Sequence, residues 1–331
     1  MTTIQLECGF DAPILTTEYP VFPLDIGGLH FTDKARDAAD WLVAYYDRKE
    51  PIPTRVPRSR RILVLTEPGA DLPAGFVNQF GILVAPQEIG GFNGVWVQNH
   101  GALPYGFGRD VSRQGFPSIY DYAALQSLEP PEKRDAVAVV VSRKTLFPGH
   151  RRRLRFLKAL KAALNERLDL FGDGLNKIPI KADAILPYKY HLALENTVMP
   201  SYWTEKLADA YLGYALPIVS GPPDLARWFP EESFLRIDLE RPEAAISAIE
   251  AALDGNLYAE RLPAIREARS RLMENERLCP LIARVIAAHP DETPRLAAPE
   301  LIQPMSKKPL PKRIAREIGR AVWRLDPRLR M

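Results

Sequence analysis

A short stretch near the middle of the chain combines acids, an amide and a cation at the start of an expected helix. Glu195 and Asn196 follow an apolar run, and the triplet Thr204, Glu205, Lys206 opens a helix expected to end near Gly213. The N-terminus of a helix has free backbone N–H groups and a partial positive charge, so it suits a phosphate. The lysine adds a second positive charge, and the acid can accept hydrogen bonds from hydroxyl groups. We therefore expect this stretch to bind the diphosphate and ribose of a nucleotide.

The basic segment 142–153 is the second candidate for anion binding. Ser142 follows the apolar run 136–141 and is a further candidate for the nucleotide. The planar fork of an arginine suits a diphosphate. A basic first turn opposes the helix dipole, which indicates an anion nearby, although a solvated basic helix start gives the same pattern. Four arginines remain alternatives for this contact: Arg151, Arg152, Arg153 and Arg155.

The order and spacing of these residues resemble the donor-binding motif of the family-10 glycosyltransferases, the inverting α1,3/α1,4-fucosyltransferases that use GDP-fucose. The resemblance covers residues 136 to 250 and is weak before them. It implies a GT-B fold, an α/β architecture in which two Rossmann-like doubly wound domains face a cleft. The motif is formed by Glu195 and Asn196, Tyr202, Glu205 and Lys206, Pro217, and Gly221 and Pro222.

The resemblance also implies roles for the donor-binding residues. Lys206 neutralises the diphosphate, Glu205 accepts from the ribose hydroxyls, and Tyr202 contacts the donor. Asn196 either donates to a phosphate oxygen or caps its turn. Glu195 either holds the site together or acts as a secondary acid.

Two further roles follow from aligning the chain with the family pattern. The alignment selects Arg153 as the donor-binding arginine, with its neighbours as alternatives. The family uses a glutamate of the acceptor domain as its general base, at the end of a strand that faces the cleft. The turn of Thr66, Glu67 and Pro68, after the apolar run 61–66, resembles that position, so Glu67 is the predicted base. An exposed loop acid is the alternative interpretation.

Alternating apolar runs and helical patterns indicate the elements that must position these residues. In the second half we expect strands at 136–141, 168–171, 189–194, 216–220 and 234–237, helices at 152–164 and 204–213, and two long helices ending near His289. In the first half we expect strands at 61–66, 80–84 and 95–97 and a helix from Asp33 to Asp47. Such alternation predicts parallel sheets with ligands at the carboxyl ends of the strands.

Domain boundaries follow from length and from a proline-rich, charged segment at 129–135. A chain of 331 residues suggests two domains of ordinary size. We expect an acceptor-binding domain at 1–130, a GDP-sugar-binding domain at 131–296 and a basic amphipathic tail at 297–331.

Several absences limit the chemistry and the location. Cys8 and Cys279 lack metal-ligand spacing, and no Asp-x-Asp clamp is present, so neither a divalent metal nor another cofactor is implied. No run of about 18 apolar residues and no signal-peptide pattern is found, which predicts a cytoplasmic protein.

The tail is basic, whereas the rest of the chain is mildly acidic. Residues 304–331 hold nine Lys/Arg and two acids, which leaves 35 basic and 39 acidic residues elsewhere. Within 312–325 apolar residues share one helical face and arginines another, a pattern typical of an interfacial helix on anionic lipid. We expect 307–330 to contact the inner face of a membrane; packing on the body is the alternative, and no nucleic-acid partner is predicted.

The leading hypothesis is therefore transfer of L-fucose from GDP-fucose to an acceptor glycan of the surface-polysaccharide or lipopolysaccharide type. Two alternatives remain from the sequence. One is the same fold with another GDP-sugar, and the other is a nucleotide-binding membrane-surface protein without transfer activity.

Overall fold

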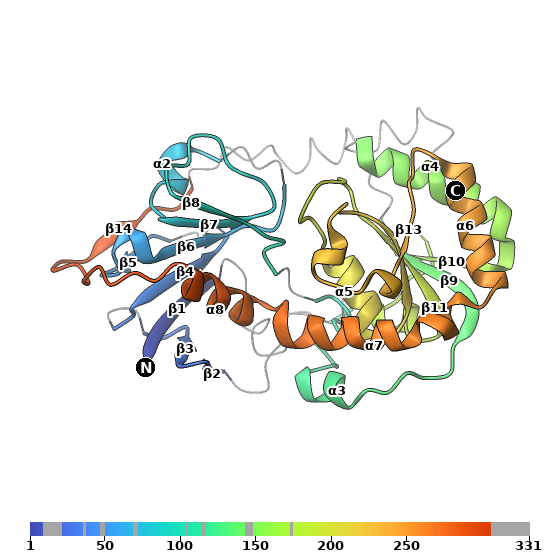
Figure 1. The fold of residues 1–331 in the computed structure, drawn as a ribbon, viewed down its shortest axis with the longest axis horizontal. Coiled ribbons are helices and arrows are strands. Elements are labelled where there is room, and N and C mark those ends of the chain that lie inside the picture. Colours follow the sequence, from blue (N-terminus) through green and yellow to red (C-terminus); the bar gives the residue numbers. More distant parts are fainter. Residues whose placement is uncertain are drawn as a thin grey trace.

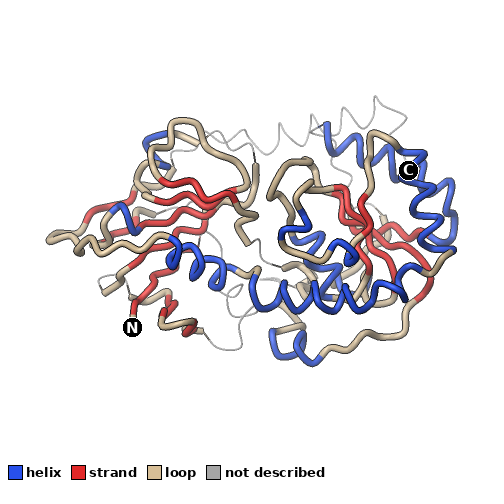
Figure 2. The backbone as a smooth tube through the Cα atoms, viewed as in Figure 1, coloured by secondary structure: helices blue, strands red, loops and turns tan. Residues whose placement is uncertain are grey.

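The computed structural model describes residues 1–8, 22–35, 38–46, 50–68, 72–102, 105–110, 112–113, 117–142, 148–172 and 175–305. Over these ranges the chain forms two α/β domains side by side, each built on its own sheet (Figures 1 and 2). The expected amphipathic tail at 307–330 lies outside the described residues. None of the described helices is both long enough and apolar enough to cross a membrane.

The first domain contains a seven-stranded sheet in which every neighbouring pair except β2 and β3 is parallel. Its spatial order is β2-β3-β1-β4-β6-β7-β8. The strands are β1 (Thr2–Cys8), β2 (Leu24–Ile26), β3 (Leu29–Thr32), β4 (Trp41–Tyr45), β6 (Arg61–Val64), β7 (Ile82–Ala85) and β8 (Val95–Gln98). A separate antiparallel pair joins β5 (Ile52–Thr54) to β14 (Glu300–Ile302).

The second domain contains a five-stranded parallel sheet with the order β10-β9-β11-β12-β13. The direction of winding reverses between β9 and β11, which makes the carboxyl ends of these two strands the place where this fold binds ligands. The strands are β9 (Arg134–Val140), β10 (Leu168–Phe171), β11 (Tyr188–Leu194), β12 (Leu216–Ser220) and β13 (Leu235–Arg236).

Helices cover the sheets and link the domains (Figure 1). The α-helices are α2 (Ala74–Val77), α3 (Tyr122–Ser127), α4 (Pro148–Leu164), α5 (Glu205–Leu212), α6 (Pro242–Asp254), α7 (Leu257–Asn275) and α8 (Leu278–Ala288). The 3-10 turns are η1 (Arg58–Arg60), η2 (Asn165–Arg167), η3 (Lys181–Ala184), η4 (Leu225–Arg227) and η5 (Glu231–Ser233).

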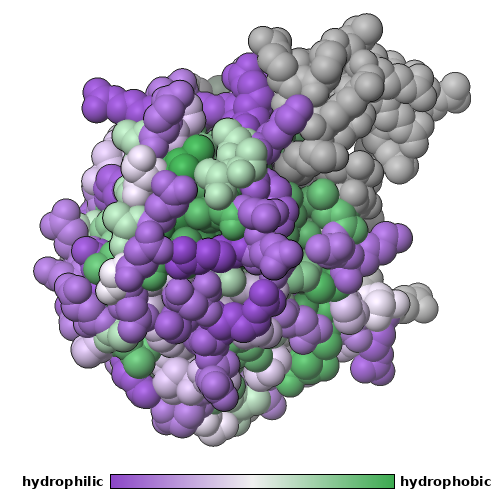
Figure 3. Space-filling view, turned by 90° about the vertical axis from the view of Figure 1, so that its right-hand side faces the viewer, coloured by the Kyte–Doolittle hydropathy of each residue, from purple (hydrophilic) through white to green (hydrophobic). Residues whose placement is uncertain are grey.

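The second domain follows the sequence pattern closely because its sheet is buried on both faces. Strands of this kind are continuous apolar runs, and Val137, Val139 and Leu192 are at most 2% exposed. Helix α4 covers the sheet with an apolar stripe that includes Leu154 and Leu157, both fully buried. The outer end of this domain shows a mainly hydrophilic surface with smaller apolar areas (Figure 3).

The expected helix from Asp33 to Asp47 is wrong, because the structure has strand β4 at Trp41–Tyr45. All five residues of β4 are buried, and the strand lies between β1 and β6 in parallel register. Helical spacing of the alanines at 35–39 suggested the helix. The run from Trp41 to Tyr45 is instead rich in aromatic and β-branched residues, and the central position in the sheet decides its conformation.

The chain returns to the first domain after α7, which differs from the expected range of 131–296 for the second domain. Three helices are present where two were expected, and Leu278, Ile282 and Val285 of α8 belong to the core of the first sheet. Ile302 of β14 packs against the opposite face of the same sheet. Burial of these apolar side chains on the first sheet therefore places residues 278–302 in that domain.

Candidate active site

A cavity of about 390 Å³ lies at the carboxyl ends of β9 and β11, with residues of both domains in its wall. The second domain provides an anion-binding set of polar side chains, and the first domain provides one carboxylate. The polar residues are Glu67 from the first domain and Ser142, His150, Arg153, Lys181, Asn196, Glu205 and Lys206 from the second. Six of the eight predicted site residues thus lie around one cavity; Glu195 and Tyr202 do not line it.

Glu195 fixes the start of α5 from the end of β11. Its Oε1 accepts hydrogen bonds from the backbone N–H and the hydroxyl of Thr204, at 2.9 and 2.7 Å. Its Oε2 accepts from Nζ of Lys206 at 2.9 Å. The side chain is buried, so of its two predicted roles the contacts match the one of holding the site together.

Lys206 stands at the first turn of α5 with its ammonium group between two carboxylates. Its Nζ lies 2.9 Å from Oε2 of Glu195 and 3.9 Å from Oε1 of Glu205. Burial disfavours the charged form, but these two carboxylates outweigh it, and the pKa of Lys206 is raised. The ammonium group therefore stays charged at the helix N-terminus, where the backbone N–H groups also favour an anion.

Glu205 lies beside two ammonium groups, those of Lys181 and Lys206. Burial alone would raise the pKa of Glu205. The charges of the two lysines have the larger combined effect, so the pKa is lowered. An ionised carboxylate only accepts hydrogen bonds, so Glu205 can receive them from ribose hydroxyls.

Lys181 in η3 is a site residue that the sequence analysis missed. Its Nζ lies 2.6 Å from Oδ2 of Asp209 and 4.0 Å from Oε1 of Glu205. Asp209 is fully buried on α5 and also accepts from the backbone N–H groups of Gly106 and Phe107. A lone lysine in a short turn before a strand has no sequence signature, so only the fold could reveal this third cation.

Arg153 meets Asn196 in the cavity wall, where its Nη1 donates to Oδ1 at 2.9 Å. The arginine is 5% exposed, and this burial lowers its pKa, with Glu195 and Glu205 opposing the shift. The start of α4 approaches the Asn196 loop closely: a Cβ on Gly149 would lie 1.9 Å from the backbone oxygen of Asn196. Glycine is therefore required there for the guanidinium to reach the amide.

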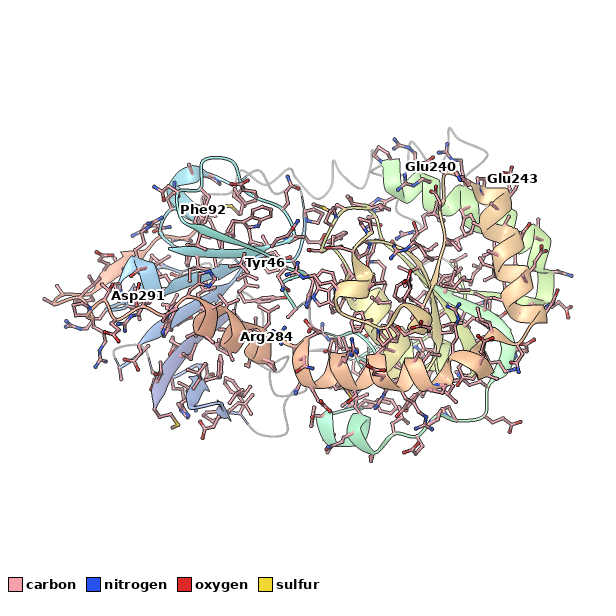
Figure 4. All side chains as sticks on the ribbon, viewed as in Figure 1. Tyr46, Phe92, Glu240, Glu243, Arg284 and Asp291 are labelled. Atoms are coloured by element: carbon pink, nitrogen blue, oxygen red, sulfur yellow. The ribbon has the colours of Figure 1, made fainter. Side chains whose placement is uncertain are left out.

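The arrangement distinguishes Arg153 from its neighbouring arginines. Arg152 forms an ion pair with Glu240 at the surface, and Glu240 lies beside the start of α4 (Figure 4). Arg155 is exposed and, like Arg151, is not part of the cavity wall.

Glu67 projects into the cavity from the loop after β6. Its side chain is exposed, and its Oε2 accepts a hydrogen bond from the hydroxyl of Tyr202 at 3.1 Å. Tyr202 itself is only 1% exposed, and its hydroxyl points to this carboxylate. The predicted donor contact of Tyr202 thus stays a prediction, whereas its contact with Glu67 was not foreseen.

The described residues contain no group of three or more His, Cys, Asp or Glu side chains arranged to hold a metal ion. The cavity instead gathers three cationic side chains, those of Arg153, Lys181 and Lys206, and two carboxylates, those of Glu67 and Glu205. Such a set suits an anionic ligand that carries hydroxyl groups, with a carboxylate available to accept a proton.

Known proteins share both the motif and the architecture. Residues 130–252 match the model of the glycosyltransferase family 10 (fucosyltransferase) C-terminal region. The 4-galactosyl-N-acetylglucosaminide 3-alpha-L-fucosyltransferase FUT6 of Pan troglodytes is 31% identical over 122 residues, which are 34% of this chain and 33% of that protein. The 3-galactosyl-N-acetylglucosaminide 4-alpha-L-fucosyltransferase FUT3 of Homo sapiens is 33% identical over 91 residues, 26% of this chain and 25% of that one. The chain thus aligns with only about a quarter to a third of the length of these relatives.

The fold is that of a solved enzyme with much lower sequence identity. A crystal structure of an alpha1,3-fucosyltransferase superposes with a TM-score of 0.51 at 17% identity, covering 88% of this chain and 91% of the other. The two domains are of the GT-B type, as expected from the sequence. All second-domain residues in the cavity wall fall within the matched segment. The comparisons therefore confirm the resemblance to the family-10 glycosyltransferases, and the sequence match is confined to residues 130–252.

Proposed function

We propose that this protein transfers L-fucose from GDP-fucose to a hydroxyl group of an acceptor glycan, with inversion at the anomeric carbon. The observation that carries the proposal is the shared cavity. Three cations and a helix N-terminus from the second domain meet one carboxylate from the first domain around it. The match of residues 130–252 to the fucosyltransferase family model supports the choice of donor.

The diphosphate would lie against Arg153 and Lys206, with Lys181 as the third cation of the wall. As the bond between the fucose carbon and the phosphate oxygen breaks, negative charge develops on GDP. Fixed cations that are already in place stabilise this charge without reorganisation. Glu205 would accept from the ribose hydroxyls, and Asn196 and Ser142 would position the phosphates or the nucleotide.

Glu67 would act as the general base. The acceptor oxygen attacks the anomeric carbon from the face opposite to GDP, and its proton passes to the carboxylate. Glu67 suits this task because it is exposed to the cavity and comes from the domain that faces the donor site. The reaction then releases GDP and the fucosylated acceptor.

The acceptor proposal is a surface-polysaccharide or lipopolysaccharide precursor, and it rests on the basic amphipathic sequence at 307–330. A helix of this composition on anionic lipid would hold the protein, as a peripheral cytoplasmic protein, close to lipid-linked acceptors. The α1,3 linkage is proposed by analogy with relatives, which include both α1,3 and α1,4 enzymes.

Turnover of a panel of GDP-sugars tests the proposal. Release of GDP from GDP-fucose, GDP-mannose and GDP-glucose is measured with and without a mixture of candidate glycans. We expect release from GDP-fucose to exceed release from the other donors. No release from GDP-fucose together with turnover of another GDP-sugar would contradict the donor assignment.

A further inference from the structure

Tyr202 connects the donor-binding domain to the predicted base. It precedes α5 in the second domain, and its hydroxyl donates to Oε2 of Glu67 in the first domain at 3.1 Å. The two residues are 135 positions apart in the chain. Because Tyr202 is buried and does not line the cavity, its ring has little surface to offer to a bound nucleotide.

The hydroxyl of Tyr202 keeps its proton and so serves as a donor to the carboxylate. Burial raises the pKa of Tyr202, and the negative charges of Glu195, Glu67 and Glu205 raise it further. With Oε2 of Glu67 occupied by this bond, the other carboxylate oxygen is left for the proton of an incoming hydroxyl group. The bond thereby selects one orientation of the carboxylate.

The loop that carries Tyr202 is fixed on both sides of the residue. Ser201 donates its backbone N–H to Asp224 at 2.9 Å, and the backbone N–H of Thr204 is bonded to Glu195. The ring of Trp203 stacks on His100 of the first domain, with 3.9 Å between centroids. The phenol therefore has a defined position relative to both domains.

The base loop is also fixed from within the first domain. The hydroxyl of Tyr46 bonds to that of Thr66, the residue before Glu67, and accepts from its backbone N–H at 3.3 Å. Tyr46 lies at the edge of the first domain that faces the second (Figure 4). A tyrosine from each domain thus holds the short segment that presents the carboxylate.

We infer that Tyr202 is a positioning residue for the general base, which orients Glu67 from the donor-binding domain. This inference rests on the proposed function. It gives Tyr202 a role that acts through Glu67, which differs from the predicted contact with the donor. It also links the base to the segment before α5, the helix whose first turn carries Glu205 and Lys206.

The variant Tyr202→Phe separates the two roles because it removes one hydroxyl and keeps the ring. If Tyr202 orients the base, kcat falls about 10- to 100-fold, as for a lost hydrogen bond to a charged group, while the Kd for GDP changes less than about twofold. Tyr211→Phe is the matched control, since Tyr211 is fully buried on α5 with its hydroxyl bonded to Ser233. Weaker GDP binding with an unchanged kcat would overturn the inference.

A double-mutant cycle with Glu67→Gln provides the second measurement. A residue that acts through Glu67 has little further effect once that carboxylate is gone, so Tyr202→Phe should lower the residual rate less than about twofold in this background. An undiminished 10- to 100-fold loss would overturn the inference. Absence of turnover by the wild-type chain with GDP-fucose would instead contradict the proposed function, so the two failures are distinguishable.

Discussion

The two domains contribute residues to the cavity wall in different ways. The second domain contributes groups from a few short segments of one sheet edge, and several bond to one another, as Glu195 does to Thr204 and Lys206. The first domain contributes one carboxylate, Glu67, whose surroundings come from distant parts of the chain. A binding surface built on one strand–helix unit has a short-range sequence pattern. A single group that is positioned by tertiary packing has almost none.

Removal of the cavity arginine is the strongest test of the second domain's share. Arg153→Ala takes away the guanidinium that bonds to Asn196 and faces the cavity. We expect kcat/KM for GDP-fucose to fall about 10²- to 10³-fold, since a preorganised group at the site of developing charge is lost. Steady-state kinetics measure the effect. The control is Arg152→Ala, which removes only a surface ion pair with Glu240 and should change kcat/KM less than about twofold. Equal losses of kcat/KM in the two variants would show that Arg153 has no special role.

A core substitution in α8 tests the assignment of residues 278–302 to the first domain. Ile282 is fully buried in the core of the first sheet, so Ile282→Ala should lower the free energy of unfolding of that domain by about 2–5 kcal/mol. Hydrogen exchange would then quicken in β4 and β6. Ile249→Ala on α6 is the matched control, because Ile249 is fully buried in the second-domain core. Faster exchange in β11 and β12 of Ile282→Ala, with β4 and β6 unchanged, would contradict the assignment of α8 to the first domain.

Lys181 tests whether the second domain binds GDP through more than its sequence motif. Lys181 pairs with the buried Asp209, so its removal alone would leave a buried carboxylate without its partner. Both proteins in the comparison therefore carry Asp209→Asn, which keeps an acceptor for the backbone N–H groups of Gly106 and Phe107. Adding Lys181→Met to this background should weaken GDP binding about tenfold, equal to about 1.4 kcal/mol. Calorimetric titration with GDP gives both dissociation constants. Identical constants would leave Lys181 with a structural role only.

His191 in β11 gives the second sheet a predicted sensitivity to acid. Burial, followed by the charges of Lys181 and Lys133, lowers the pKa of His191 to about 3 in the folded protein. Between pH 6.5 and 3 the unfolded chain binds a proton that the folded chain does not. Stability is therefore lost as pH falls through this window, with a slope of up to about 1.4 kcal/mol per pH unit.

The variant His191→Gln removes this titration. Urea unfolding at several pH values should show a shallower loss of stability than in the wild-type chain over the same window. Parallel curves for the two proteins would show that His191 does not titrate in this way.

The sequence was sufficient for the buried strands and the motif helix of the second domain. Buried parallel strands are short apolar runs, so β10 and β12 were predicted with their observed bounds, and α5 begins directly after Thr204 as expected. Of the motif residues, Asn196, Glu205 and Lys206 lie in the cavity wall beside the end of β11. Glu195 and Lys206 meet because the N-cap of α5 lies opposite that strand end.

The remaining features depend on contacts that no local pattern records. Strand β4 was mistaken for a helix because neighbouring alanines have helical spacing, whereas its place at the centre of a sheet determines its conformation. Helix α8 packs on the first domain because its apolar side chains cover the first sheet and not the second, and its own sequence does not specify which sheet it covers. Lys181 and the bond between Tyr202 and Glu67 connect elements far apart in the chain, so they could be found only in the folded structure.

The central claim is that the first domain supplies the base and the second domain binds the donor, and Glu67→Gln tests it most directly. The measurement pairs the Kd for GDP with the rate of fucose transfer at saturating GDP-fucose. We predict an unchanged Kd and a transfer rate lower by at least about two orders of magnitude, the scale of a lost general base. A variant that binds GDP and transfers fucose at the wild-type rate would contradict the account.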